Sequence, residues 1–84
     1  MTLLWTPGDP LRDVVGTEGL PQRLIWRGRT HPVEHIDHRW RVDNEWWRQR
    51  VWRDYFQLST TTGLLIVVYH DLLADRWYLQ RLYD

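Results

Sequence analysis

The stretch "DYFQLSTTTGLLIVVYH", residues 54–70, sets the fold class of this chain. Its first part, "DYFQLSTTTG", is rich in residues that favour β-structure and ends in a threonine-glycine turn. The following "LLIVVYH" is a continuous apolar run, as expected for a central strand that is covered on both faces. The stretch therefore predicts two consecutive strands, at about residues 51–59 and 64–70.

Segments on both sides of this stretch also have the pattern of strands. Apolar and charged side chains alternate in "RLIWRGR" (23–29) and in "VEHIDHRWRV" (33–42), as in half-buried antiparallel strands. A last extended segment is "RWYLQRLYD" (76–84). We therefore expect an all-β domain over residues 20–84, a small antiparallel meander of about five strands that is curled or closed into a barrel.

The first 19 residues carry turn signals rather than a clear strand pattern. The segment "TPGDP" (6–10) combines two prolines with a glycine, and "LRDVVGTEG" (11–19) adds two more glycines. We expect an irregular N-terminal arm over residues 1–19, with one short strand near residues 11–15.

The segment "NEWWRQRVWRDYF" (44–56) fits two structures. Trp47, Val51 and Tyr55 recur at the spacing of one helical face. The β-favouring residues that follow, and the lack of a helix cap, argue against a helix. We favour a loop or a single helical turn at residues 43–49, followed by a strand.

Composition limits the kinds of function that are open to the chain. Its 11 acidic and 11 basic residues cancel, so no net field attracts nucleic acid or an acidic membrane. Every basic residue is arginine, and there is no cysteine for a disulfide, a thiolate nucleophile or a zinc–thiolate site. The longest apolar run is too short to span a bilayer, and the N-terminus lacks a signal-peptide pattern. We expect a soluble, cytoplasmic protein with no membrane partner.

Residue types that carry enzyme chemistry are sparse. His35 and His38 would point to opposite faces of a strand, because the side-chain period of a strand is two. Ser59 is the only serine, and Asp71 and Asp75 are expected to cap the turn after the apolar strand. No glycine-rich phosphate loop is present. We expect a protein that is not an enzyme and has no catalytic residues, metal site or cofactor.

Seven tryptophans are more than a domain of 84 residues is expected to bury fully. Half or more of the aromatic rings could form a core, with arginines stacked over their edges. The adjacent Trp46 and Trp47 cannot both face inward if their segment is extended. We therefore expect some rings to stay exposed as a binding surface.

Arginine and aromatic residues alternate in "WRGR", "HRWRV" and "EWWRQRVWRDYF". This combination dominates protein–protein hot spots, and it also binds single-stranded nucleic acid on small β-barrels. The neutral charge favours a protein partner over nucleic acid, and a homodimer whose exposed rings meet across a two-fold axis is a third alternative. The candidate binding residues are Trp46, Trp47, Arg48, Arg50, Trp52, Arg27, Arg29, Arg39 and Arg41.

In their order along the chain, "WRGR", "EWW", "RDYF" and "RWYLQRLYD" resemble the carboxyl-terminal segment of ImuB-type proteins. These are catalytically degenerate relatives of Y-family DNA polymerases in bacterial damage-induced mutagenesis. The chain also resembles small stand-alone bacterial proteins of unknown function that carry the same module. The resemblance covers about residues 20–84 and implies an accessory or docking domain in DNA repair and translesion synthesis.

The chain departs from the ImuB pattern in three respects. It lacks the polymerase palm and its metal-binding carboxylates, so nucleotidyl transfer is not implied. The segment "QLSTT" (57–61) begins like a sliding-clamp-binding peptide but lacks its final apolar pair. Gln80 stands where family members often have a histidine, so no role of that histidine is transferred.

Overall fold

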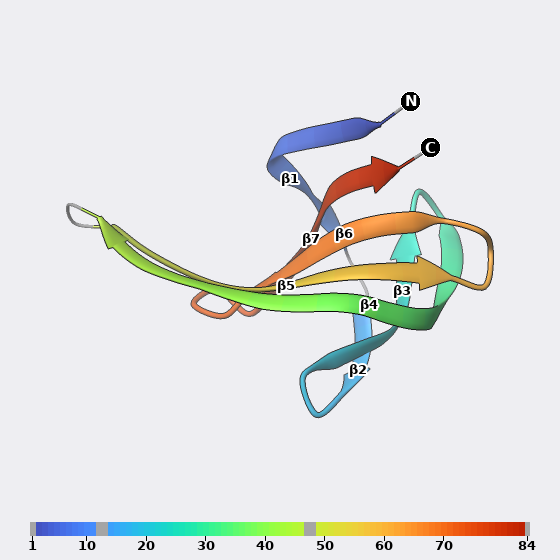
Figure 1. The fold of residues 1–84 in the computed structure, drawn as a ribbon, viewed down its shortest axis with the longest axis horizontal. Helices are drawn as coiled ribbons and strands as arrows, with labels where there is room; N and C mark the ends of the chain where they lie inside the picture. The colour runs from blue at the N-terminus through green and yellow to red at the C-terminus, as the bar shows by residue number, and fades with distance from the viewer. Residues whose placement is uncertain (1, 12–13, 47–48, 84) are drawn as a thin grey trace.

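The computed structural model of the protein describes residues 2–11, 14–46 and 49–83. The regular structure in these ranges consists of seven β-strands and no helix. All seven pair antiparallel in one sheet, in the order β1-β7-β6-β5-β4-β3-β2 (Figure 1). The strands are β1 (Leu3–Leu11), β2 (Val14–Thr17), β3 (Leu20–Trp26), β4 (Arg29–Trp46), β5 (Gln49–Thr60), β6 (Leu65–Asp71) and β7 (Arg76–Tyr83).

The sheet is mostly a meander, because each strand from β2 to β7 pairs with the next one along the chain. Only β1 departs from this order, since it pairs with β7 at the other end of the sheet. The all-β antiparallel fold expected from the sequence is confirmed. The described residues form seven strands in all, more than the expected number of about five, and five of them, β3–β7, lie within residues 20–84.

The two additional strands come from the segment that was expected to be an irregular arm. That expectation is wrong, because β1 pairs with β7 and β2 pairs with β3. The register of β1 shifts between Leu4 and Asp9, where proline and glycine interrupt the regular ladder. An edge strand tolerates such a bulge because one of its sides carries no ladder hydrogen bonds. Pairing with β7 thus overrides the local turn signals.

The sheet curls until its edge strand β1 contacts β3 through side chains, but it stays open. The Trp5 ring on β1 meets the Trp26 ring on β3 edge-on, with centroids 5.9 Å apart. The Trp26 indole N–H donates a hydrogen bond of 3.1 Å to the Asp9 carboxylate. Within the described ranges, no backbone ladder joins the edge strands β1 and β2. The expectation of a curled sheet is met, and the alternative of a closed barrel is wrong.

Strand alternation gives the sheet two packed faces. The inner face, turned into the curl, carries the main core, while the outer face carries a second, aromatic cluster. Neighbouring residues of β5 divide between them: Phe56 lies in the main core and Tyr55 in the outer cluster. The buried residues of the main core are Leu11, Leu24, Phe56, Leu58, Ile66, Val68 and Leu79. Those of the outer cluster are Tyr55, Val67 and Tyr69.

The outer cluster is a row of rings that crosses four strands. Trp40 on β4 stacks on Tyr55 with centroids 5.3 Å apart, and Tyr55 contacts Tyr69 on β6 at 5.1 Å. Tyr69 in turn stacks on Tyr78 of β7 at 5.0 Å. Burial raises the pKa of Tyr69, whose hydroxyl also hydrogen-bonds with the Gly8 backbone on β1. The row therefore joins β1 and β4–β7 from outside the curl.

The longest hairpin, formed by β4 and β5, extends beyond the rest of the sheet (Figure 1). β4 runs without a break to Trp46, and β5 begins at Gln49. The expected loop or helical turn at residues 43–49 is therefore wrong for residues 43–46 and 49, which belong to strands, while residues 47 and 48 lie outside the described residues. β5 pairs with β6 only from Arg53 onward, so the end of the hairpin is a two-stranded arm. Backbone pairing across the hairpin outweighs the helical spacing of its apolar residues.

Gly8 allows β1 to approach the tyrosine row closely. A Cβ atom at this position would lie 2.8 Å from the Tyr78 Cβ and 2.9 Å from the Tyr69 hydroxyl. We expect Gly8→Ala to lower the free energy of unfolding by about 1–3 kcal/mol, the usual cost of overpacking. Urea unfolding monitored by tryptophan fluorescence measures the loss.

The Tyr69→Phe variant tests the cause of that loss. It removes one of the three close contacts, the one with the Tyr69 hydroxyl, so Gly8→Ala should cost less stability in the Tyr69→Phe background than in the natural chain. Strictly additive losses in the double variant would contradict the clash.

Candidate interaction surface on the β4–β5 hairpin

The register of β4 and β5 brings four of the predicted binding residues onto one face. Arg39 pairs with Phe56, Arg41 with Asp54 and Asp43 with Trp52. Directly paired residues of antiparallel strands point to the same side of the sheet, here the inner side. The resulting Arg–Trp face consists of Arg39, Arg41, Asp43, Arg50, Trp52 and Asp54.

Asp54 anchors the half of the Arg–Trp face that lies nearer the main sheet. Its carboxylate accepts hydrogen bonds from Arg41 Nε at 2.6 Å and from Arg41 Nη2 at 3.1 Å. Arg39 Nη2 approaches the same carboxylate at 3.5 Å. The Asp54 side chain is only 7% exposed, whereas those of Arg41 and Arg39 are 52% and 46% exposed. A buried anion thus orients two cations that remain open to solvent.

The charges of this cluster support one another. The hydrogen bond from Arg41 is the largest cause that holds the pKa of Asp54 below its usual range, against the opposing effect of burial. The same hydrogen bond raises the pKa of Arg41. Both groups of this pair are therefore charged near neutral pH.

Trp52 and Arg50 form the other half of the face, on the two-stranded arm. The Arg50 guanidinium lies 4.8 Å from the Trp52 ring centroid, and that of Arg41 lies 5.9 Å from it. Arg50 also pairs with Asp43 through contacts of 3.3 and 3.4 Å. Cations over an indole face are held by the ring quadrupole. The face therefore has an aromatic centre between guanidinium groups.

The remaining predicted residues do not join this face. Arg27 and Arg29 lie at the β3–β4 turn, where the Arg27 guanidinium covers the Trp26 ring at 4.7 Å. Twelve residues of β4 separate Arg29 from Arg41, which is roughly 40 Å along a strand. Trp47 and Arg48 lie outside the described residues, and so does the side chain of Trp46. The prediction that one ring of the double tryptophan is exposed therefore stays a prediction.

The exposure of the tryptophan side chains shows whether they form a core or a surface. The tryptophans with described side chains are Trp5, Trp26, Trp40, Trp52 and Trp77, and none of them is among the buried residues. Trp40 is 40% exposed on the outer face, while the others are half-buried. The expectation that some rings stay exposed is confirmed. Trp5, Trp26 and Trp77 pack against the main core, and Trp40 stacks on Tyr55 of the outer cluster.

Sequence reasoning missed the two carboxylates that order the arginines. Asp43 and Asp54 face Trp52 and Arg41 across the hairpin, a relation that appears only once the strand register is known. Pairing of Trp46 with Gln49 fixes this register. The expectation of a loop at residues 43–49 hid it.

A second cluster lies where β6 turns into β7. The His70 ring stacks on the Trp77 ring with centroids 4.4 Å apart, and its Nε2 lies 2.8 Å from the Asp75 carboxylate. Asp71 accepts hydrogen bonds from the amides of Leu73 and Ala74, which confirms its predicted role in capping this turn. Asp75, which was also expected to cap the turn, contacts His70.

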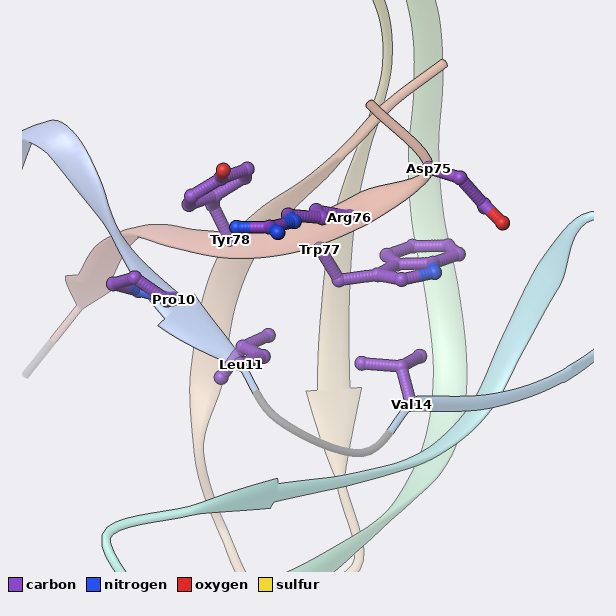
Figure 2. A pocket seen from close by; sticks show the side chains of 7 residues that line it. All are labelled: Pro10, Leu11, Val14, Asp75, Arg76, Trp77 and Tyr78. Carbon is purple, nitrogen blue, oxygen red and sulfur yellow. The ribbon is translucent and has the colours of Figure 1, made fainter. Parts of the chain in front are cut away.

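A cleft of about 430 Å³ adjoins this turn. Figure 2 shows Leu11, Val14 and Trp77 on one side of β7, and the Tyr78 ring with Arg76 on the other. The predicted binding residues do not line it. Among the described residues, no group of three or more potential ligands could hold a metal ion. Four of the predicted binding residues, Arg39, Arg41, Arg50 and Trp52, thus lie on an open face of the hairpin rather than in this cleft.

Comparison with known families assigns the chain. Residues 9–84 match the family described as a domain of unknown function, DUF6504. The chain belongs to the DUF6504 family. The match begins within β1 and includes the whole Arg–Trp face, so this face is part of the DUF6504 domain.

The DUF6504 chain is also similar to Protein ImuB of Caulobacter vibrioides, in two strains of that species. The identity is 29% over 77 aligned residues, which cover 75% of this chain and 17% of ImuB. The resemblance seen in the sequence motifs is thereby confirmed. The chain spans only about a sixth of the length of these relatives. No solved structure matches it.

The described residues include no helix of the length and apolar character that crossing a bilayer requires.

The pKa of Asp54 gives the DUF6504 domain a pH-dependent stability. Because its folded pKa lies below the unfolded value of about 3.9, the contribution of Asp54 is complete above about pH 4 and is lost as the pH falls below it. We expect Asp54→Asn to lower Tm by about 4–8 °C at neutral pH and by less at pH 2–3. Thermal unfolding followed by circular dichroism at several pH values measures the difference.

The matched control is Asp43→Asn, which removes a carboxylate from an exposed pair on the same face. Exposed pairs contribute little to stability, so Tm should change only slightly. A Tm difference for Asp54→Asn that stayed constant between pH 7 and pH 2 would contradict the assigned role.

Proposed function

We propose that this DUF6504 domain is a non-enzymatic, cytoplasmic protein-interaction module in DNA repair or translesion synthesis. The Arg–Trp face would be its contact surface. The similarity to ImuB and the sequence motifs behind it support the repair context. The partner would be a protein of the same machinery.

The main support for this proposal is the ordered but solvent-accessible state of the arginines. Asp54 and Asp43 hold Arg41 and Arg50 in place while both arginine side chains stay about half exposed. A side chain that is already ordered loses less conformational entropy when a partner binds. Arginine and tryptophan are also the residues that contribute most to protein–protein hot spots.

Local charge favours a protein over a nucleic acid as the partner. The face contains three arginines, but Asp43 and Asp54 neutralise most of their charge. A phosphate backbone would meet these carboxylates as well as the guanidinium groups, which weakens its binding. A protein surface can place acidic groups on the arginines and apolar groups on Trp52.

We expect Trp52→Ala and Arg50→Glu each to weaken binding of the partner by about ten-fold or more, as is typical of hot-spot residues. Purified variants would be titrated against individual DNA-repair proteins of the source organism, including its ImuB-type protein, by calorimetry. Thermal unfolding verifies that each variant is folded.

Arg23→Glu is the matched control, because Arg23 is exposed on β3 and lies outside the Arg–Trp face. It makes the same charge change as Arg50→Glu and should leave binding unchanged. Equal weakening by both reversals, or none by either, would contradict the proposed surface.

Single-stranded nucleic acid is the second candidate partner, since guanidinium groups beside an indole also bind stacked bases. We expect fluorescence anisotropy with a labelled oligonucleotide to show no binding at low salt. Micromolar binding that weakens steeply with added salt would favour nucleic acid instead.

A further inference from the structure

β4 has a long edge that pairs with no other strand of the described chain. On one side it pairs with β5 along most of its length. On its other side, β3 covers only residues 29–32. Residues 33–46 of β4 therefore present unpaired backbone groups along this edge, within the part of the chain that the structure describes. Such an edge can accept a further strand.

Only part of this edge is regular. Register shifts interrupt β4 between Val33 and His35 and again between Ile36 and His38. From Arg39 to Trp46 every residue pairs one-to-one with β5. Bulges discourage edge pairing, whereas a regular ladder permits it. A strand would therefore add beside residues 39–46.

The charges on this regular segment, "RWRVDNE" (39–45), are antisymmetric about Val42. Arg41 and Asp43 lie one residue from the centre, and Arg39 and Glu45 lie three residues from it. All four have the same parity, so their side chains share the inner face of the hairpin. Two copies of the segment placed antiparallel would match each arginine with a carboxylate.

We propose that this protein forms a homodimer in which the β4 edges of two copies pair antiparallel, centred on Val42. Arg41 then faces Asp43 of the second copy, and Arg39 faces its Glu45. The two-fold axis repeats both contacts, so four ion pairs form on one face. Paired residues have the same parity, as antiparallel backbone hydrogen bonding requires. Val42 meets its own copy on the outer face.

The neighbouring registers are less favourable. Centring the pair on residue 41 would oppose two copies of Arg41, and centring it on residue 43 would oppose two copies of Asp43. Each of these registers keeps only two ion pairs, from Arg39 to Asp43 in the first and from Arg41 to Glu45 in the second, instead of four. Like charges directly opposite each other destabilise a strand pair. Charge thus selects one register as well as the partner.

The usual protective use of charge on an edge strand does not explain this pattern. Charges of one sign repel a second edge and prevent aggregation. Here the opposite signs lie at equal distances from the centre, which attracts a second copy. The two-fold axis is perpendicular to the sheet, so both Arg–Trp faces would lie on the same side of the dimer and form one larger surface.

The monomer leaves three of these groups open to a further contact, while Asp43 already pairs with Arg50 at 3.3 and 3.4 Å and would share its half-exposed carboxylate with the second copy. Arg41 bonds Asp54 through Nε and Nη2, and its Nη1 is a further donor. Arg39 makes only a 3.5 Å contact with Asp54, and Glu45 is exposed. A strand pair of seven residues is a small interface, so we expect a dimer that dissociates on dilution.

Sedimentation velocity of the full chain from about 10 μM to about 1 mM should show a reversible monomer–dimer equilibrium. Arg39→Glu and Glu45→Arg should each weaken the dimer by about ten-fold or more, because each opposes like charges twice. A mixture of the two variants should dimerise like the natural chain, since the carboxylate introduced at position 39 of one variant then meets the guanidinium introduced at position 45 of the other.

The matched controls are two single-charge reversals away from the regular segment, Arg23→Glu on β3 and Glu34→Arg on the bulged part of β4. Both should leave dimerisation unchanged.

A chain that stays monomeric at about 1 mM would overturn the proposal. So would a dimer that Arg39→Glu and Glu45→Arg leave intact, or variants whose mixture dimerises no better than either alone. Dimerisation is measured on the isolated chain and partner binding by titration with a second protein, so either property can fail without the other.

Discussion

Almost every feature of the molecule follows from the antiparallel register of β4 and β5, since this register assigns each side chain of the hairpin to a face. It places Phe56 in the main core and Tyr55 in the aromatic row on the other side. It also sets Asp54 beside Arg41 and Trp52 beside Asp43. A shift of one residue would exchange the two faces, exposing the core and burying the charges. Core packing and the proposed binding surface therefore depend on the same pairing.

The domain is stabilised by packing on both faces of a curled sheet rather than by disulfides. Aliphatic residues and Phe56 fill the inside of the curl, and tyrosines cover the outside. The outer row reaches β1 through the close approach of Gly8, while Trp5 and Trp26 join β1 to β3 on the inside. Large rings allow a short chain to bury enough surface, and their exposed edges remain available for contacts.

The Arg–Trp face shows how a neutral chain can present ordered cations. Asp54 is buried and carries two hydrogen bonds from Arg41, so the guanidinium is fixed without leaving the solvent. The distal part of the face continues onto a two-stranded arm, away from the main core (Figure 1). A partner could reach this arm because it extends away from the core and its arginines are held in place. The β4 edge that pairs with no other described strand lies beside the same residues.

Local patterns in the chain were enough to predict the all-β class and the central strands around Phe56 and Val68. The composition was enough to predict that the interior cannot fully bury all the tryptophans. Alternation and apolar runs report these features because burial acts on each strand locally. The folded arrangement was needed to show that residues 3–11 and 14–17 form strands, that the sheet stays open, and that Asp54 orders Arg41. These features depend on which distant strands pair and in which register, and hydrogen bonds across strands leave no periodic signal in the chain that makes them.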